Sequence, residues 1–186
     1  LNVTLDSFSD GGLYYDQKKA IGHGLQMVED GADIIDIGGE STRPGSQTVP
    51  VNTEIKRVIP VINSLVKKIK IPISIDTKKA KVAMAAIDVG AEIINDISAL
   101  SSDKNMAKIV GKTRAGLILM HMRGTPGNMQ KGDLLYNDLM GEIIIHLKKA
   151  IDKAKSAGIK EENIVVDPGV CFGKTPDDNY KIIKYL

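Results

Sequence analysis

The sequence predicts an α/β protein of the (β/α)8 TIM barrel class, with about six of the eight βα units present in the chain. Short apolar segments recur at intervals of about 20–45 residues with a helix-forming stretch in each gap, which is a βα repeat. Nearly every segment ends in a polar residue, whereas an open doubly wound sheet gathers its polar groups at one crevice. The Gly-x-Gly-x-x-Gly turn of a dinucleotide-binding sheet is also absent.

The composition is that of an ordinary globular domain. Apolar residues make up 42% and charged residues 26% of the 186 residues, which suits one domain, 1–186, with a sizeable core. The net charge of +2 gives no reason to expect nucleic-acid or membrane binding, and no apolar run approaches the roughly 18 residues of a membrane span. The single cysteine excludes an internal disulfide and fits a reducing compartment, so we expect a cytoplasmic location.

Six short apolar strands are expected. The clearest is the β-branched run that begins at Ile164, leads into Asp167 and is ended by Pro168 and Gly169. Such a run predicts a strand buried on both faces, with a carboxylate at its end. The expected strands cover residues 1–4, 32–37, 71–75, 92–97, 116–121 and 163–167, the first being the end of a longer strand.

A helix is expected in each gap between strands. Apolar residues at spacings of three and four mark these helices, and Gly31, Gly90 and Gly158 follow three of them as stop signals. The last helix should begin with Asp177 or Asp178 as its N-cap. The other expected helices cover about residues 16–30, 51–69, 78–89, 103–111 and 134–157.

Three loops that follow strands, at 5–12, 38–47 and 122–133, are long for simple connections, and long loops often carry function. The loop at 5–12 contains Asp6 and Asp10 with two glycines and suits a mobile lid, a plain loop being the alternative. The loop at 38–47 contains the segment 42–45, Thr-Arg-Pro-Gly, with the parts of a phosphate or carboxylate clamp. A surface turn with a solvated arginine is the alternative there.

The polar residues at the strand ends form the main candidate site, because all strand ends of a barrel converge on one mouth. Carboxylates and amides with few cations suit a ligand rich in N–H donors, such as a planar amino-substituted heterocycle. The alternative is that Asp76, Asn95 and Asp167 merely cap turns, an interpretation that weakens as the pattern repeats. The residues expected to converge are Asn2, Asp36, Asp76, Asn95, Asp96, His121 and Asp167.

Other reactive residue types predict structural roles. His23, His121 and His146 lack the spacing of metal ligands. Cys171 has no adjacent base in the sequence, which argues against a nucleophile.

Six motifs together resemble those of the dihydropteroate synthase family of pterin-binding enzymes, in the family's order and spacing across essentially the whole chain. They are LNVTLDSFSDGG at 1–12, GADIIDIGGESTRPG at 31–45, SIDT at 74–77, INDI at 94–97, LMHM at 119–122 and DPG at 167–169. The resemblance implies a (β/α)8 barrel and a transferase of folate biosynthesis. Its reaction joins 6-hydroxymethyl-7,8-dihydropterin pyrophosphate to p-aminobenzoate, which gives 7,8-dihydropteroate and pyrophosphate and is inhibited by sulfonamides.

The resemblance assigns the site residues by position. Asp76, Asn95 and Asp167 would hold the pterin ring, and Met120 would pack against it. Asn2 would help to place Mg²⁺ and the pyrophosphate. The substrates would be these small molecules, with no nucleic acid or membrane as a partner, and the full-length protein would form a homodimer.

Two loops and the segment after the last strand would complete the site. By resemblance, Thr42 and Arg43 lie near the phosphates, while Phe8, Pro44 and Phe172 shape the aminobenzoate pocket. The chemistry agrees with this assignment. Positive charge grows on the pterin as pyrophosphate leaves, so the catalytic carboxylates would stabilise a cation, and the arginine would take up charge on the leaving group.

The chain departs from the family's pattern at three places. Leu5 replaces a usual proline, and Cys171 replaces a usual glycine after the Asp-Pro-Gly-x motif. The family's Ser-Arg-Lys and Arg-x-His segments of the last two strands do not occur, so we expect the chain to be a portion of a longer protein, truncated at its C-terminus. If these 186 residues were the whole protein, we would expect weak or no turnover.

Two other functions fit parts of the sequence. A pterin-binding methyltransferase of the same superfamily would share Asp76, Asn95 and Asp167 but would not need the loops at 6–12 and 41–45. A catalytically silent pterin-binding fragment would fit the missing segments. Dependence on p-aminobenzoate separates the synthase from the methyltransferase, and turnover separates it from the silent binder.

Overall fold

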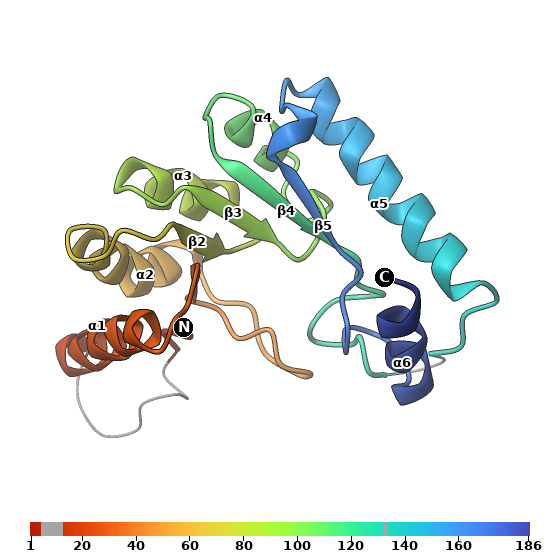
Figure 1. Cartoon of the computed structure of the whole chain (residues 1–186), viewed down its shortest axis with the longest axis horizontal. Coiled ribbons are helices and arrows are strands. Elements are labelled where there is room, and N and C mark those ends of the chain that lie inside the picture. Colours follow the sequence, from red (N-terminus) through yellow and green to blue (C-terminus); the bar gives the residue numbers. More distant parts are fainter. Residues whose placement is uncertain (5–12, 132–133) are drawn as a thin grey trace.

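Five parallel strands form one sheet in the order β1-β2-β3-β4-β5, so that each strand pairs with the next one in sequence (Figure 1). The computed structural model describes residues 1–4, 13–131 and 134–186. The strands are β1 (Ile35–Gly38), β2 (Ile73–Asp76), β3 (Ile93–Asp96), β4 (Gly116–Met120) and β5 (Ile164–Asp167). Sequential order is that of a barrel wall, since a doubly wound sheet reverses its order at a switch point. The predicted class is confirmed, and the structure is an arc of a (β/α)8 barrel.

The predicted strand segment at residues 1–4 is present as a single parallel bridge beside β1. Asn2 pairs with Gly38, and the Val3 N–H donates to the Gly38 carbonyl at 2.8 Å. This places the start of the chain next to the first strand of the sheet, as a βα repeat requires.

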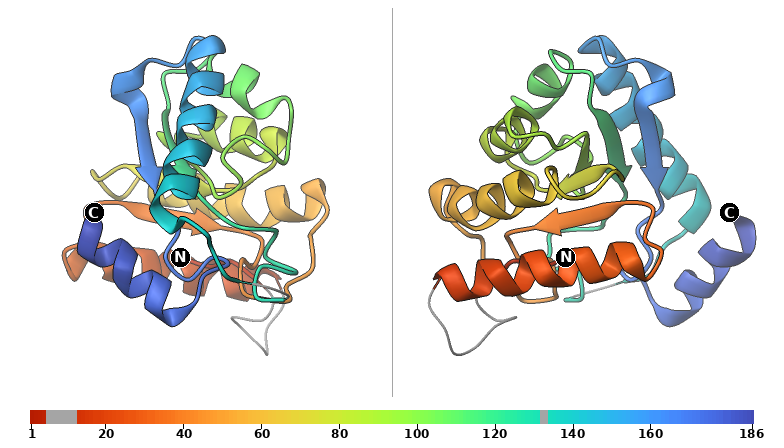
Figure 2. Two further views of the ribbon diagram at one scale, coloured as in Figure 1. Left: turned by 90° about the vertical axis from the view of Figure 1, so that its right-hand side faces the viewer. Right: turned by 60° about the vertical axis from the view of Figure 1, so that its left-hand side comes forward.

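The helices that connect the strands lie along the outer side of the arc. The loops that follow the strands, together with α6, gather at the end where the strands terminate (Figures 1 and 2). The helices are α1 (Leu13–Glu29), α2 (Val51–Leu65), α3 (Ala80–Asp88), α4 (Met106–Val110), α5 (Leu139–Ser156) and α6 (Pro176–Tyr185). Within the described ranges, no helix is both long and apolar enough to cross a membrane.

The strand register sorts the side chains onto two faces of the sheet. Successive residues of a strand point to opposite faces, so residues paired across strands share a face. The face toward the helices is apolar and almost completely buried, and it holds Ile35, Ile37, Ile73, Ile75, Ile94, Leu117 and Leu119. The opposite, concave face holds Asp36, Ser74, Asp76, Asn95, Met120 and Asp167. The polar face is therefore the inside of the barrel arc.

Helix α1 starts about three residues earlier and α4 about three residues later than predicted, and the starts of α5 and α6 differ because of their caps. The long helix α5 begins at Leu139 rather than near 134, since the Asp138 side chain accepts the Gly141 N–H at 3.0 Å. Helix α6 is capped by Thr175, not by either predicted aspartate. Thr175 and Asp178 form a capping box in which each side chain binds the other's backbone N–H.

The prediction that the last strand is buried on both faces is wrong. In β5, Val165 is 59% exposed and Val166 is 46% exposed. Among the described residues β5 pairs only with β4, so it is an edge strand. The apolar run predicted the strand itself but not the absence of a neighbour.

Candidate active site

Three of the predicted site residues lie in one row across adjacent strands. The register pairs Asn2 with Gly38, Gly38 with Asp76, and Asp76 with Asn95. All three side chains therefore belong to the concave face near the strand ends. This is the convergence that the sequence predicted, and it brings one carboxylate and two amides together.

Asp36 lies on β1 two residues before Gly38, on the same face of the sheet, and orients Asn95. The Asn95 Nδ2 donates to Asp36 Oδ2 at 3.2 Å. The amide oxygen of Asn95 is thereby left as an acceptor, which suits a ligand N–H. Asp36 Oδ1 and Ser74 Oγ are buried without a hydrogen-bond partner among the described residues, so the floor of this site has unused polar capacity.

Asp76 has the most perturbed carboxyl of the concave face. Burial, followed by the nearby charges of Asp36 and Glu54, raises its pKa to about 8. Asp76 therefore favours its protonated form at neutral pH. A ligand that donates N–H groups or carries positive charge would favour its ionised form instead.

On the same concave face, toward the β5 edge of the sheet, Met120 and Asp167 form a second pair. The register places them opposite each other on β4 and β5, and Met120 is buried. Asp167 Oδ1 accepts the Gly169 N–H at 2.7 Å, which leaves its other oxygen available. Gly169 lies so close to β4 that a Cβ there would fall 1.9 Å from the carbonyl oxygen of His121. The Asp-Pro-Gly motif is thus the tight contact between the end of β5 and the end of β4.

The loop between β5 and α6 carries Phe172 and is built around a buried lysine. Lys174 is 2% exposed, and burial lowers its pKa to about 8. Its Nζ donates to the carbonyls of Gly169 at 2.8 Å and Phe172 at 3.1 Å. Sequence reasoning missed this residue, because a lone lysine after a glycine is usually solvated.

The same loop explains the departure at Cys171. Cys171 has a φ of 70°, in the left-handed region that favours glycine. Its side chain is exposed, so the strain is in the backbone and not in crowding of the site. The usual glycine of the family's pattern therefore serves the backbone conformation.

His121 is held in its neutral form and is buried against Lys174 and His146. Burial, with the nearby charge of Lys174, lowers its pKa to about 3. Its Nδ1 lies 3.0 Å from Lys174 Nζ and its ring meets His146 edge-on, with centroids 4.9 Å apart. Because an ammonium only donates, Nδ1 is the acceptor and the ring proton is on Nε2.

Asp96 does not join the mouth, contrary to expectation. It follows Asn95, so it points to the opposite face, and it is completely buried. Its carboxylate accepts from the N–H and hydroxyl of Ser98 and from the Leu100 N–H. These bonds make Asp96 the anchor of the loop between β3 and α4.

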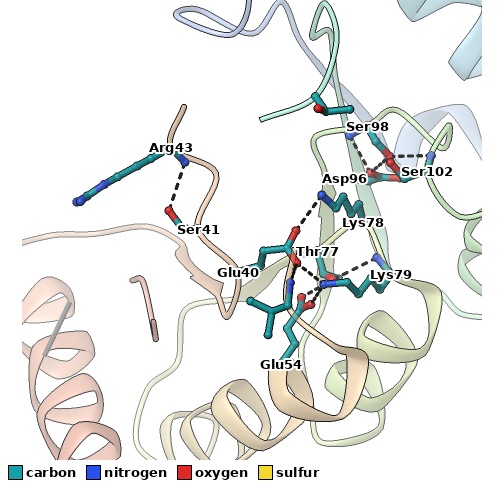
Figure 3. A network of polar contacts seen from close by, with 12 residues as sticks. Glu40, Ser41, Arg43, Glu54, Thr77, Lys78, Lys79, Asp96, Ser98 and Ser102 are labelled. Atoms are coloured by element: carbon teal, nitrogen blue, oxygen red, sulfur yellow. Dashed lines mark hydrogen bonds and ion pairs between the residues drawn. The ribbon is translucent and has the colours of Figure 1, made fainter. Parts of the chain in front are cut away.

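The predicted anion-binding loop extends from β1 over the mouth. Thr42 is half-buried, whereas Arg43 and Pro44 are exposed. Figure 3 shows the Arg43 side chain extending away from the neighbouring polar network. The Gly45 N–H donates to the Pro126 carbonyl at 3.0 Å, so this loop contacts the loop between β4 and α5. Arg43 is free of ion pairs within the described ranges and can reach an anion.

A polar network missed by the sequence reasoning anchors this loop (Figure 3). Glu40 forms ion pairs with Lys78 and Lys79 and accepts the Val49 N–H at 2.7 Å. Lys79 also pairs with the completely buried Glu54. Together with their lysine partners, these carboxylates tie both ends of the loop to α2 and to the start of α3.

A sequence signal for this network did exist. Glu54 lies on the same helical face as Val58, Val61 and Leu65, at spacings of three and four residues. A carboxylate on an apolar stripe predicts a buried partner. The Thr77 hydroxyl, which donates to Glu54 at 2.7 Å, completes that pairing.

The described residues do not form a preassembled metal cage. They contain no group of three or more histidine, cysteine, aspartate or glutamate side chains that could hold a metal ion. Asn2 is exposed at the mouth and offers one amide oxygen. One such ligand suits Mg²⁺, which commonly binds one or two protein oxygens together with waters and substrate phosphates.

Some predicted residues cannot be placed. Phe8 of the aminobenzoate pocket, both acidic residues of the proposed lid, and Leu5 lie outside the described residues. Phe172, which is also predicted to border the aminobenzoate pocket, is half-buried in the loop after β5.

Comparison with known proteins agrees with this geometry. The family model described as "Pterin binding enzyme" matches residues 1–186. A dihydropteroate synthase from Clostridium beijerinckii is 47% identical over the whole chain, which covers 66% of that relative. The structure of a dihydropteroate synthase from Clostridium difficile, solved in the presence of pteroic acid, has a TM-score of 0.90 and 47% identity over 99% of this chain and 67% of that one.

A dihydropteroate synthase from Yersinia pestis, solved with a sulfonamide drug complex, has a TM-score of 0.92 and 40% identity. The match includes the whole of this chain and 66% of the Yersinia pestis chain. The chain spans between 62% and 66% of the length of the first curated relatives it matches. Because the family model covers every residue, the chain belongs to the family of pterin binding enzymes.

Proposed function

We propose that the protein that carries this chain is a dihydropteroate synthase. It would join the amino nitrogen of p-aminobenzoate to the methylene carbon of 6-hydroxymethyl-7,8-dihydropterin pyrophosphate, with loss of pyrophosphate. The observation that carries this proposal is the concave row of Asp76 and Asn95, with Asp167 at the end of β5. Relatives solved with pteroic acid and with a sulfonamide drug support the same substrate class.

The carboxylates of this site suit a reaction in which the pterin becomes positively charged. As the bond between the methylene carbon and the pyrophosphate oxygen breaks, charge spreads over the ring. Asp76 and Asp167 are placed to stabilise that charge, and the shift of Asp76 toward its ionised form would accompany it. The amine then bonds to the carbon and releases one proton to solvent. An arylamine is already neutral at pH 7, so no base is needed to start.

The leaving pyrophosphate needs positive groups near the mouth. Arg43, exposed on the loop after β1, and the Thr42 hydroxyl are our candidates for its phosphates. Asn2 is our candidate ligand for Mg²⁺, which when bound would share the negative charge of the leaving group. The exposed Pro44 and the half-buried Phe172 would border the aminobenzoate.

We also propose that the protein is cytoplasmic and acts as a homodimer. The single cysteine supports a reducing compartment, and the family resemblance supports the dimer. Light scattering of the purified protein tests the oligomeric state, and a monomer at micromolar concentration would reject it.

The test of the function is calorimetric binding of dihydropterin pyrophosphate with Mg²⁺, together with pyrophosphate release in the presence of p-aminobenzoate. We expect Asp167→Asn to weaken pterin binding at least tenfold, because it removes one of the charges that hold the ring. Asp177→Asn, an exposed carboxylate in the first turn of α6, is the control and should bind as the wild type does. Wild-type affinity in Asp167→Asn would reject the ring-holding role. Pterin binding that ignores p-aminobenzoate and sulfonamides would favour the methyltransferase.

A further inference from the structure

Lys174 is a buried ammonium whose partners are carbonyl groups rather than carboxylates. Its Nζ reaches the carbonyls of Gly169, Phe172 and His121, the last at 3.3 Å, and the Nδ1 of His121. No carboxylate of the described residues forms an ion pair with it. A buried charge that forms no direct ion pair is costly, so these acceptors must converge closely to hold it.

The acceptors converge only because the loop after β5 has an unusual backbone. Gly169, Cys171 and Gly173 all have positive φ, at 71°, 70° and 68°. These alternating left-handed positions turn the carbonyls of Gly169 and Phe172 toward one point. The loop therefore depends on a donor at that point, and Lys174 is the donor that the structure provides.

Every contact of this ammonium is adjacent to a residue of the proposed site. The Gly169 N–H binds Asp167 Oδ1, Phe172 is itself a proposed substrate contact, and His121 directly follows Met120. A shift of the loop would move the carboxylate that holds the pterin and the aromatic ring beside the aminobenzoate. Lys174 itself is enclosed, with only 2% of the residue exposed.

We infer that Lys174 is a positioning residue, which holds the loop at 168–173 so that Asp167 and Phe172 face the substrates. The inference rests on the proposed function for its substrates, but the loop-holding part stands on the contacts alone. The residue acts through backbone carbonyls and does not touch the reacting atoms.

The test compares Lys174→Met with Lys153→Met in the protein that carries this chain. Lys153, an exposed residue, is the control, since its Nζ also donates to a loop carbonyl, that of Leu100, away from β5. Two readouts are needed: amide hydrogen exchange of Gly169 and Phe172 without ligand, and calorimetric affinity for dihydropterin pyrophosphate with Mg²⁺. We expect Lys174→Met to speed exchange of both amides at least tenfold and to weaken pterin binding at least tenfold. Lys153→Met should leave both within twofold.

Two results would overturn the inference: unchanged exchange in Lys174→Met, or faster exchange with wild-type pterin affinity. If Lys174→Met does not fold, Lys174→Gln, which keeps one short donor, replaces it with the same expectations at a smaller size. Failure of the wild-type protein to bind pterin would count against the proposed function. The exchange measurement alone would then decide whether Lys174 holds the loop.

Discussion

Two loops at the mouth of the barrel are held in opposite ways. The loop after β1, residues 39–50, is anchored by Glu40 through two lysines whose charges are matched by carboxylates. The loop after β5, residues 168–175, is anchored by one ammonium on neutral carbonyls. The loop between β4 and α5 contacts both, through Pro126 on one side and Gln130 on the other. Paired charges suit a loop that presents a cation to solvent, whereas an enclosed donor suits a loop that must keep one backbone conformation.

The largest effect should come from the paired network. Glu54→Ala leaves Lys79 with one carboxylate fewer and opens a cavity in a completely buried position, so we expect a loss of about 3–5 kcal/mol in the free energy of unfolding. Urea unfolding measures this change. The exposed pair of Lys155 and Glu161 is the control, and Glu161→Ala should leave the urea midpoint of unfolding essentially unchanged. Equal losses of stability in Glu54→Ala and Glu161→Ala would show that burial does not determine how much an ion pair contributes.

The next effect concerns the backbone of the second loop. Gly169→Ala would place a Cβ 1.9 Å from the His121 carbonyl oxygen at a φ of 71°. We therefore expect the free energy of unfolding to fall by about 3 kcal/mol or more and pterin binding to weaken. Gly31→Ala also has a positive φ but no atom within 4 Å of the added Cβ, and it should cost only about 1–2 kcal/mol. Thermal and urea unfolding of both variants separate close contact from backbone strain. A Gly169→Ala variant as stable as Gly31→Ala would contradict the contact.

The two anchors should respond differently to pH. Burial lowers the pKa of Lys174 to about 8, below its ordinary value of 10.5, so between these values the unfolded chain binds the extra proton. Stability due to this group therefore rises with pH, by up to about 3 kcal/mol between pH 8 and 10.5, relative to Lys174→Met. The charged or titratable groups facing it are Asp167, Arg123, Asp178, Cys171, His121 and His146.

The first loop should respond with the same sign but in the acidic range. The lysines and the Val49 N–H lower the pKa of Glu40 despite its burial, so its stabilising effect is present above pH 4.5 and is lost as pH falls through its folded value. Urea unfolding of the wild type, Glu40→Gln and Lys174→Met from pH 3 to 10.5 tests both predicted changes of the free energy of unfolding with pH. A wild-type stability that falls from pH 8 to 10.5 relative to Lys174→Met would contradict the unpaired ammonium.

The smallest effect should be a gain. Cys171→Gly relieves a left-handed φ at an exposed residue, and the added freedom of glycine in the unfolded chain offsets part of that relief, so we expect up to about 1 kcal/mol of stabilisation. Leu100 also has a positive φ, 65°, but is completely buried. Leu100→Gly should therefore destabilise, because lost burial exceeds the relief of strain. A lower melting temperature for Cys171→Gly would contradict the strain at this position.

Much of the fold could be predicted because its signals are local. Apolar runs ended by polar residues located all six strand segments, and glycines after apolar stripes located the ends of α1, α3 and α5. The missed starts of α5 and α6 depend on which of several neighbouring polar side chains reaches a backbone N–H, as at Asp138 and Thr175. Spacing alone does not choose among such residues.

For the site, the sequence determined which residues end the strands of the barrel, and so the row of Asp76 and Asn95 and the pair of Met120 and Asp167. Only the tertiary structure decided which strand-end residues face inward, since Asn95 and Asp96 are neighbours in sequence on opposite faces of the sheet. It alone decided that Lys174 is buried and that Lys79 is the partner of the buried Glu54. The physical reason is that periodicity is a property of one segment, whereas the partner that makes a buried charge tolerable comes from a distant part of the chain.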